Sequence, residues 1–188
     1  KGMPDRWKVI KDVIFAYGFE PDEGARQKLI QNEKKLMGGN IDYPYALSSE
    51  KKKVELNILK KPSHSSVLKP NNNFISLYTK RHPEGFELDF KVNVEAIDLD
   101  SLDLKVKDFM KIDVQGYELK VLEGSESSLK EILGLDIEVE FSELYKQQCS
   151  FGEIKDYLLI NGFEFVDFTS LTRWERDSSK NTLGLCMG

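Results

Sequence analysis

The sequence predicts an α/β fold with a mainly parallel sheet. Short runs of β-branched and aromatic residues alternate along the chain with segments of helical periodicity, which is the pattern of βα units. The first run, residues 13–19, is apolar almost throughout, as strands buried on both faces are. The length of 188 residues corresponds to one domain, which we expect to cover residues 1–188.

Turn residues bound the first strand and the first helix. Pro21 can donate no hydrogen bond to a strand ladder, so the strand at 13–19 should end before it. A helix is expected from Glu23 to Met37, because Asp22 suits the N-cap and two glycines follow the helical pattern.

Three further strands are expected before residue 100. Residues 41–47 read as a strand despite Pro44, and residues 54–59 and 86–97 alternate apolar with polar side chains. Such alternation indicates half-exposed strands, and we expect the strand at 54–59 to be antiparallel. The stretch 60–85 is the longest irregular one. The apolar face of the strand at 86–97 would comprise Leu88, Phe90, Val92 and Val94.

The C-terminal half repeats the order of strand and helix. A buried strand is expected just before Asp113, and one helix should follow it. That helix would bury Leu119, Leu122, Leu129 and Leu133. Ser150 and Glu153 fit a capping box at the start of another helix. Further strands are expected at residues 135–141, 163–168 and 182–187.

Composition excludes several classes of protein. Acidic residues outnumber basic ones, 32 to 27, and the net charge of -5 argues against a nucleic-acid partner. No run reaches the ~20 apolar residues that span a bilayer, and residues 1–8 lack a signal-peptide core. Cys149 and Cys186 form neither a disulfide framework nor a metal-ligand pattern. We therefore expect a cytoplasmic protein without a metal site.

Acidic residues lie at the ends of three of the expected strands: Glu20, Asp113 and Glu140. Ligands of open α/β sheets bind beyond the carboxyl ends of the strands, so these acids are candidates for a site. Glu20 could accept hydrogen bonds from the two hydroxyls of a ribose, and the alternative is a helix-capping or surface acid.

Asp113 ends the most apolar strand, and Gly116 after it allows close approach of the backbone to a ligand. The carboxylate could bind a substrate hydroxyl, orient a cofactor, help to hold a cation or act as a general base. The alternatives are a helix cap and an ion pair with Lys111, which the strand alternation places on the same face.

Other polar residues are weaker candidates. Glu118 begins a helix, where the helix dipole favours a carboxylate in any case. Glu138 and Glu140 share a strand face, and we expect Glu140 but not Glu138 to line a cleft. His64 and His82 read as solvated loop histidines, although His64 could contact a substrate.

Two strings resemble the motifs of one methyltransferase family. Residues Tyr17–Asp22 resemble the FEP motif of the FkbM family, and Phe109–Gly124 resembles its KIDVQGxE signature. Residues that match the family elsewhere come in its order, and the similarity covers roughly residues 14–168. These matching residues are Ala46–Leu47, Ser65–Ser66, Ile97–Asp98, Glu138–Glu140 and Gly162–Phe163.

The resemblance implies a methyltransferase that uses S-adenosylmethionine and methylates a hydroxyl of a sugar or a small natural product. Its fold would be a Rossmann-like class I methyltransferase sheet with an added β-hairpin. Asp113 would lie where the methyl donor and the acceptor meet and would take the acceptor's proton, with Glu118 and Glu140 as alternates. The residues that would bind the cofactor are Glu20 at the ribose, its neighbours Pro21 and Asp22, Tyr45 and Ala46 at the adenine, and Asp113.

One feature departs from the family pattern. The family's first strand and its glycine-rich cofactor turn match no string in residues 1–18. The resemblance therefore implies a domain that is incomplete at both ends, without its first strand and part of its last. Two other functions stay open: a non-catalytic Rossmann-like binding or assembly module derived from a methyltransferase, and a nicotinamide-dependent reductase, whose ribose Glu20 would also suit.

Overall fold

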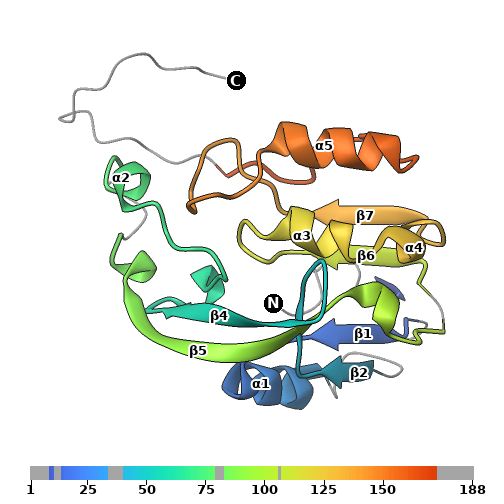
Figure 1. The fold of residues 1–188 in the computed structure, drawn as a ribbon, viewed down its shortest axis with the longest axis horizontal. Helices are drawn as coiled ribbons and strands as arrows, with labels where there is room; N and C mark the ends of the chain where they lie inside the picture. The colour runs from blue at the N-terminus through green and yellow to red at the C-terminus, as the bar shows by residue number, and fades with distance from the viewer. Residues whose placement is uncertain (1–8, 11–13, 34–39, 79–82, 106, 173–188) are drawn as a thin grey trace.

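The computed structural model describes residues 9–10, 14–33, 40–78, 83–105 and 107–172, and it confirms the α/β class. Within these described residues the strands form three small sheets rather than one continuous sheet. Two of these sheets are parallel pairs, and the third has three strands. Figure 1 shows that the strands of both parallel pairs point toward the same side of the molecule.

The first βα unit follows the prediction. Strand β1 spans Ala16–Phe19 and pairs in parallel with β2, Asn40–Tyr43. Helix α1 spans Glu23–Glu33 between them, and the predicted end of this helix near Met37 lies outside the described residues. Asp22 caps α1, because its Oδ1 accepts a hydrogen bond from the Ala25 N–H at 2.7 Å.

The prediction of one strand at 41–47 is wrong. Strand β2 ends at Tyr43, and β3, Ala46–Leu47, pairs with a different sheet. Pro44 lies at the break, and its missing N–H explains why the ladder stops there. The chain therefore passes from one sheet to the next at Pro44 and Tyr45.

The three-stranded sheet has the order β3-β5-β4, with β4 at Lys52–Leu59 and β5 at Leu88–Ile97. Strand β4 is antiparallel to β5, and β3 is parallel to it. One apolar cluster of this sheet consists of the buried side chains Val54, Leu56, Ile58, Val94 and Ala96. The predicted apolar face of β5 is buried only in part, because Leu88 is 49% and Phe90 50% exposed.

The stretch between β4 and β5 is less irregular than its sequence suggests. It contains a short helix, α2, at Asn72–Ile75. Two 3-10 turns flank it, η2 at Pro62–His64 and η3 at Pro83–Phe86. A third such turn, η4, follows β5 at Leu99–Ser101.

The second parallel pair joins β6, Phe109–Ile112, to β7, Gly134–Ile137. The single helix predicted between them is two short helices, α3 at Glu118–Glu123 and α4 at Glu126–Leu129. They are separated at Gly124, where a Cβ would lie 1.9 Å from the Ser48 carbonyl oxygen. Leu133, which was expected on the buried face, follows α4 and is 85% exposed.

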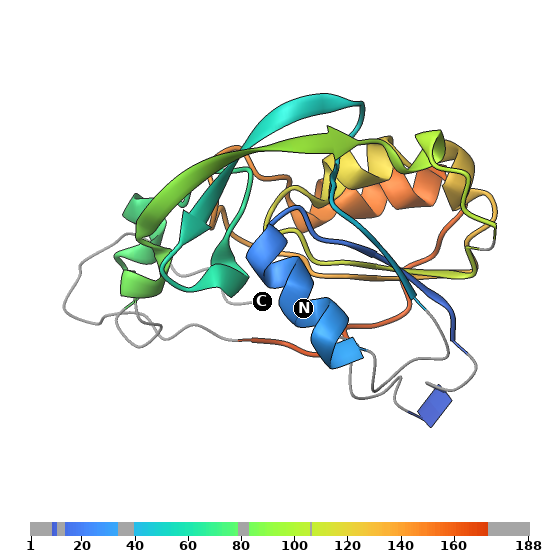
Figure 2. The same cartoon turned by 90° about the horizontal axis from the view of Figure 1, so that it is seen from below.

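The main core lies between β6 and the helices α3, α4 and α5, of which α5 spans Phe151–Ile160. The predicted capping box of α5 is confirmed, since Ser150 and Glu153 cap each other's backbone. Figure 2 shows α3, α4 and α5 gathered together and apart from α1. The core side chains of this cluster are Ile112, Val121, Leu122, Leu129, Ile132 and Ile154.

Two predicted strands differ from the structure near the C-terminus. Strand β7 stops at Ile137, so Glu138 and Glu140 lie just beyond its carboxyl end rather than within it. Residues 163–168 form no strand, and Phe165 and Val166 are exposed there. The strand predicted at 182–187 lies outside the described residues. Within the described part of the chain, every helix is too short or too polar to cross a bilayer.

Candidate active site

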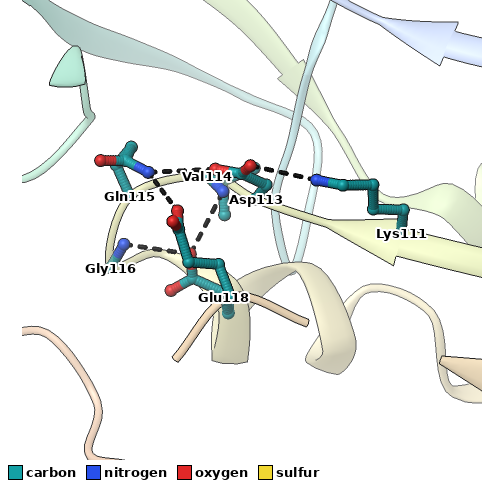
Figure 3. Close-up of polar contacts among 7 residues, drawn as sticks. Lys111, Asp113, Val114, Gln115, Gly116 and Glu118 are labelled. Atoms are coloured by element: carbon teal, nitrogen blue, oxygen red, sulfur yellow. Dashed lines mark hydrogen bonds and ion pairs between the residues drawn. The ribbon is translucent and has the colours of Figure 1, made fainter. Parts of the chain in front are cut away.

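The loop that follows β6 brings several polar side chains together around Asp113. This side chain is 11% exposed, and both carboxylate oxygens are engaged (Figure 3). Oδ2 forms an ion pair with the Lys111 ammonium at 3.0 Å, and Oδ1 accepts a hydrogen bond from Gln115 Nε2 at 3.0 Å. The ion pair with Lys111 that the strand alternation suggested is therefore present. It coexists with a position at the carboxyl end of a parallel strand.

Gln115 connects this loop to three other segments. Its Nε2 also donates a hydrogen bond to the carboxylate of Glu138, beyond β7. Its Oε1 accepts a hydrogen bond from the Tyr145 hydroxyl at 3.0 Å, and its backbone carbonyl accepts one from Ser66 Oγ at 2.7 Å. One residue therefore contacts Ser66, Glu138 and Tyr145, which are well separated from it along the chain.

Glu118 holds the backbone of the same loop. Its side chain is only 3% exposed, and Oε1 accepts hydrogen bonds from the N–H groups of Val114 and Gly116, each at 3.1 Å (Figure 3). Burial raises the pKa of this carboxyl above its ordinary value, although the backbone hydrogen bonds oppose that shift. The carboxylate faces the loop backbone, so its geometry is that of an internal cap.

Gly116 meets two demands at this turn. Its φ of +95° is in the region that glycine adopts without strain. A Cβ there would lie 3.1 Å from Gln148 Cβ and 3.3 Å from the Tyr145 ring. The tight turn thus lets the loop pack directly on Tyr145.

Tyr145 is fully buried beneath the loop. Its hydroxyl lies within hydrogen-bond distance of two acceptors, the His64 carbonyl at 2.8 Å and Gln115 Oε1 at 3.0 Å. Burial and the nearby carboxylates of Glu140 and Glu138 raise the pKa of Tyr145 far above its ordinary value. The phenol therefore stays protonated and acts as a donor. The His64 ring stacks on Phe86 with the centroids 4.2 Å apart, and His82 lies outside the described residues.

Glu20 lies at the carboxyl end of β1. Its Oε1 accepts the Asp22 N–H at 3.0 Å across Pro21, and burial raises the pKa of its carboxyl. Among the residues that the structure describes, Oε2 accepts no hydrogen bond. Because Asp22 provides the cap of α1, Glu20 does not serve as the cap. Glu20 directly follows β1 and Asp113 directly follows β6, and these two strands point toward the same side of the molecule (Figure 1).

The remaining candidates, Tyr45, Ala46 and Glu140, lie on other segments of the chain. Tyr45 is half-buried at the passage between β2 and β3. Ala46 is paired with Ala96 and packs against the core of the three-stranded sheet. Glu140 is half-buried beyond β7, close enough to influence the Tyr145 hydroxyl. The described residues include no cluster of three or more side chains suited to a metal ion.

Three members of this cluster were missed in the sequence: Gln115, Glu138 and Tyr145. Gln115 precedes a loop glycine, which is a local signal that its backbone turns sharply. Glu138 was expected to lie outside the site, yet it contacts Gln115. Tyr145 carries no local signal, because its role depends on contacts with residues 30 and 81 positions away.

A comparison with models of protein families matches residues 6–165 to the Methyltransferase FkbM domain. This match spans most of the chain and includes both Glu20 and the loop after β6. Comparison with curated proteins and with solved structures finds no significant match.

Proposed function

Because the chain belongs to the FkbM methyltransferase family, we propose that it transfers a methyl group from S-adenosylmethionine to a hydroxyl oxygen of a sugar or a small natural product. The observation that carries this proposal is the Asp113 carboxylate, which Lys111 and Gln115 hold at the carboxyl end of β6. Ligands of parallel sheets bind at such strand ends.

The residues around β1 suit the cofactor's nucleoside. Glu20 offers Oε2 as an acceptor for a ribose hydroxyl, while the Asp22 N–H fixes the orientation of the carboxylate through Oε1. Pro21 and Asp22 would shape the turn, and Tyr45 and Ala46 would border the adenine. When bound, the cofactor supplies an electrophilic methyl group on a positively charged sulfur.

Asp113 is the proposed general base. One of its oxygens would accept the proton of the acceptor hydroxyl while the oxygen–methyl bond forms. A carboxylate that is paired with a lysine is a weak base. Methyl transfer from a sulfonium, however, needs in-line positioning more than strong base catalysis, so a fixed orientation of Asp113 is the larger contribution.

The alternate bases have different surroundings. Glu118 accepts two backbone N–H groups of the loop, so we assign it the role of holding Val114 and Gly116 rather than of touching the acceptor. Glu140 lies two residues beyond Glu138 and remains the alternate base in this proposal.

The test measures formation of S-adenosylhomocysteine by mass spectrometry. The protein is incubated with S-adenosylmethionine and a panel of hydroxyl acceptors that includes methyl α-D-glucopyranoside, glycerol and catechol. Asp113→Asn should lower turnover of the best acceptor about 10²-fold or more, the range of general base catalysis. Its affinity for S-adenosylmethionine should be close to that of the wild type.

The matched control is Asp108→Asn. Asp108 is an exposed aspartate that directly precedes the first residue of β6, at the opposite end of the strand from Asp113. This variant should retain wild-type turnover. Equal turnover by Asp113→Asn and Asp108→Asn would remove Asp113 from the reaction.

A further inference from the structure

The Gln115 side chain is engaged at all of its polar atoms. Nε2 has two N–H groups, and its two partners are the carboxylates of Asp113, at 3.0 Å, and Glu138. Oε1 has the Tyr145 hydroxyl at 3.0 Å. A reversed amide would turn its oxygen toward both carboxylates, so these two partners determine the orientation of the amide.

The backbone of Gln115 is in an unusual conformation. Its φ of +57° is in the left-handed region, which residues with a Cβ rarely adopt. The chain around it is held by separate contacts: Glu118 accepts the N–H groups of Val114 and Gly116, and Ser66 Oγ donates to the Gln115 carbonyl. Glycine would adopt this backbone without strain, yet a glutamine occupies the position. Strained backbone of this kind persists where the surrounding structure and the side chain's function require it.

From this arrangement we infer that Gln115 is a positioning residue for methyl transfer. This inference rests on the proposed role of Asp113 as the base. The two N–H groups of one amide hold the like-charged carboxylates of Asp113 and Glu138 beside each other, and Lys111 holds the second oxygen of Asp113. The Tyr145 hydroxyl fixes the amide itself. Figure 3 shows Gln115 and Lys111 on either side of the Asp113 carboxylate. By holding that carboxylate, Gln115 would set the direction in which Asp113 presents its oxygens to the acceptor hydroxyl.

Two substitutions test the inference. Gln115→Gly removes the side chain but suits the left-handed backbone, and Gln115→Met keeps the length of the side chain but removes its donors and acceptor. Both should lower kcat for the best acceptor of the panel roughly 10- to 100-fold, the loss that misplacement by about 1 Å produces. KM for S-adenosylmethionine should stay within about twofold of wild type, because the interaction acts on the reaction rather than on cofactor binding.

The matched control is Gln147→Gly. Gln147 is also a glutamine with a left-handed backbone, at φ +66°, but it is exposed and lies outside the Asp113 cluster. The same substitution should leave kcat at the wild-type value. A merely structural role for Gln115 predicts instead that Gln115→Gly, which is compatible with the backbone, retains its activity.

The outcomes separate this inference from the proposed function. Wild-type kcat in Gln115→Gly together with a large loss in Asp113→Asn would overturn the inference and leave the base in place. Full activity in Asp113→Asn would remove Asp113 as the base and the inference with it, whereas wild-type protein that forms no S-adenosylhomocysteine with any acceptor of the panel would overturn the proposed function itself.

A second measurement can be made on the protein without a methyl acceptor. The side-chain amide signals of Gln115 can be assigned in ¹H–¹⁵N spectra by their absence from the spectrum of Gln115→Met. Asp113→Asn and Glu138→Gln should each shift these signals, because each replaces one charged acceptor of the amide by a neutral one. Signals that stay in place in both variants would overturn the inference.

Discussion

Replacing Glu118 with alanine would leave the N–H groups of Val114 and Gly116 without the acceptor that both share. A buried donor that loses its partner costs about 1–3 kcal/mol, so the two together predict a loss of about 2–6 kcal/mol in the free energy of unfolding. Urea denaturation followed by circular dichroism measures this loss, provided that the dependence on urea is the same for both proteins.

Glu118→Gln separates the acceptor from the charge. The glutamine carbonyl can still accept both N–H groups, so this variant should be far more stable than the alanine variant. The control is Glu123→Ala on the same helix, which removes only an ion pair with Lys120 at the surface. It should change stability by less than about 1 kcal/mol.

The stabilities of wild type and Glu118→Gln should differ in their dependence on pH. Burial raises the pKa of Glu118 above its ordinary value of 4.5, so the folded protein binds the proton more tightly than the unfolded chain. Wild-type stability from this group is therefore greatest in acid and falls as the pH rises from 4.5 through the raised pKa. Glutamine does not titrate, so the stability of Glu118→Gln relative to wild type should be higher near neutrality than near pH 4.5.

Two results would refute this reasoning. An alanine variant within about 0.5 kcal/mol of wild type would mean that the loop does not depend on the carboxylate, as expected for an ordinary surface position. A glutamine variant that is as unstable as the alanine variant would mean that the charge, and not the acceptor, holds the loop.

Two further substitutions test the packing around the site. Gly124→Ala would force a Cβ against the Ser48 carbonyl oxygen, 1.9 Å away, and should lower the free energy of unfolding by about 1–3 kcal/mol or more. The control is Gly152→Ala, whose Cβ would lie 3.7 Å from its nearest contact. Thermal denaturation should show that this control is as stable as wild type or more stable. Asp100→Ala removes the acceptor for Ser128 N and Oγ at the start of α4 and should cost about 0.5–2 kcal/mol near neutrality. Burial favours the protonated carboxyl, but the hydrogen bonds from Ser128 outweigh it and lower the pKa of Asp100 below 3.8. In urea denaturation the stability lost in Asp100→Ala should therefore shrink as the pH falls through the lowered pKa. A loss of stability that is constant with pH would contradict this assignment.

Local sequence signals identified the elements whose boundaries depend on neighbouring residues. Asp22 and Ser150 cap helices as predicted, because a cap needs only the next three residues. The split at Pro44 and the break at Gly124 were missed. The former depends on which sheet each flanking strand joins, and the latter on a backbone 76 positions away.

The candidate site shows the same division. Asp113 and Glu20 could be proposed as candidates because both directly follow apolar strands, and the carboxyl ends of parallel strands carry ligand sites. Gln115, Glu138 and Tyr145 could not, because their grouping depends on side-chain contacts between three separate segments. The expected preference for Glu140 over Glu138 relied on strand alternation, whereas β7 has already ended at Ile137.

Calorimetric titration with S-adenosylmethionine is the most direct test of the account, which depends on a nucleoside-bearing methyl donor at the ends of β1 and β6. Wild-type protein should bind, and Glu20→Ala should bind more weakly by about 1.5–3 kcal/mol, the contribution of a hydrogen bond to a charged group. Glu23→Ala, an exposed neighbour on α1, should bind as wild type does. Wild-type protein that gives no heat of binding would contradict the account and favour a non-catalytic binding module.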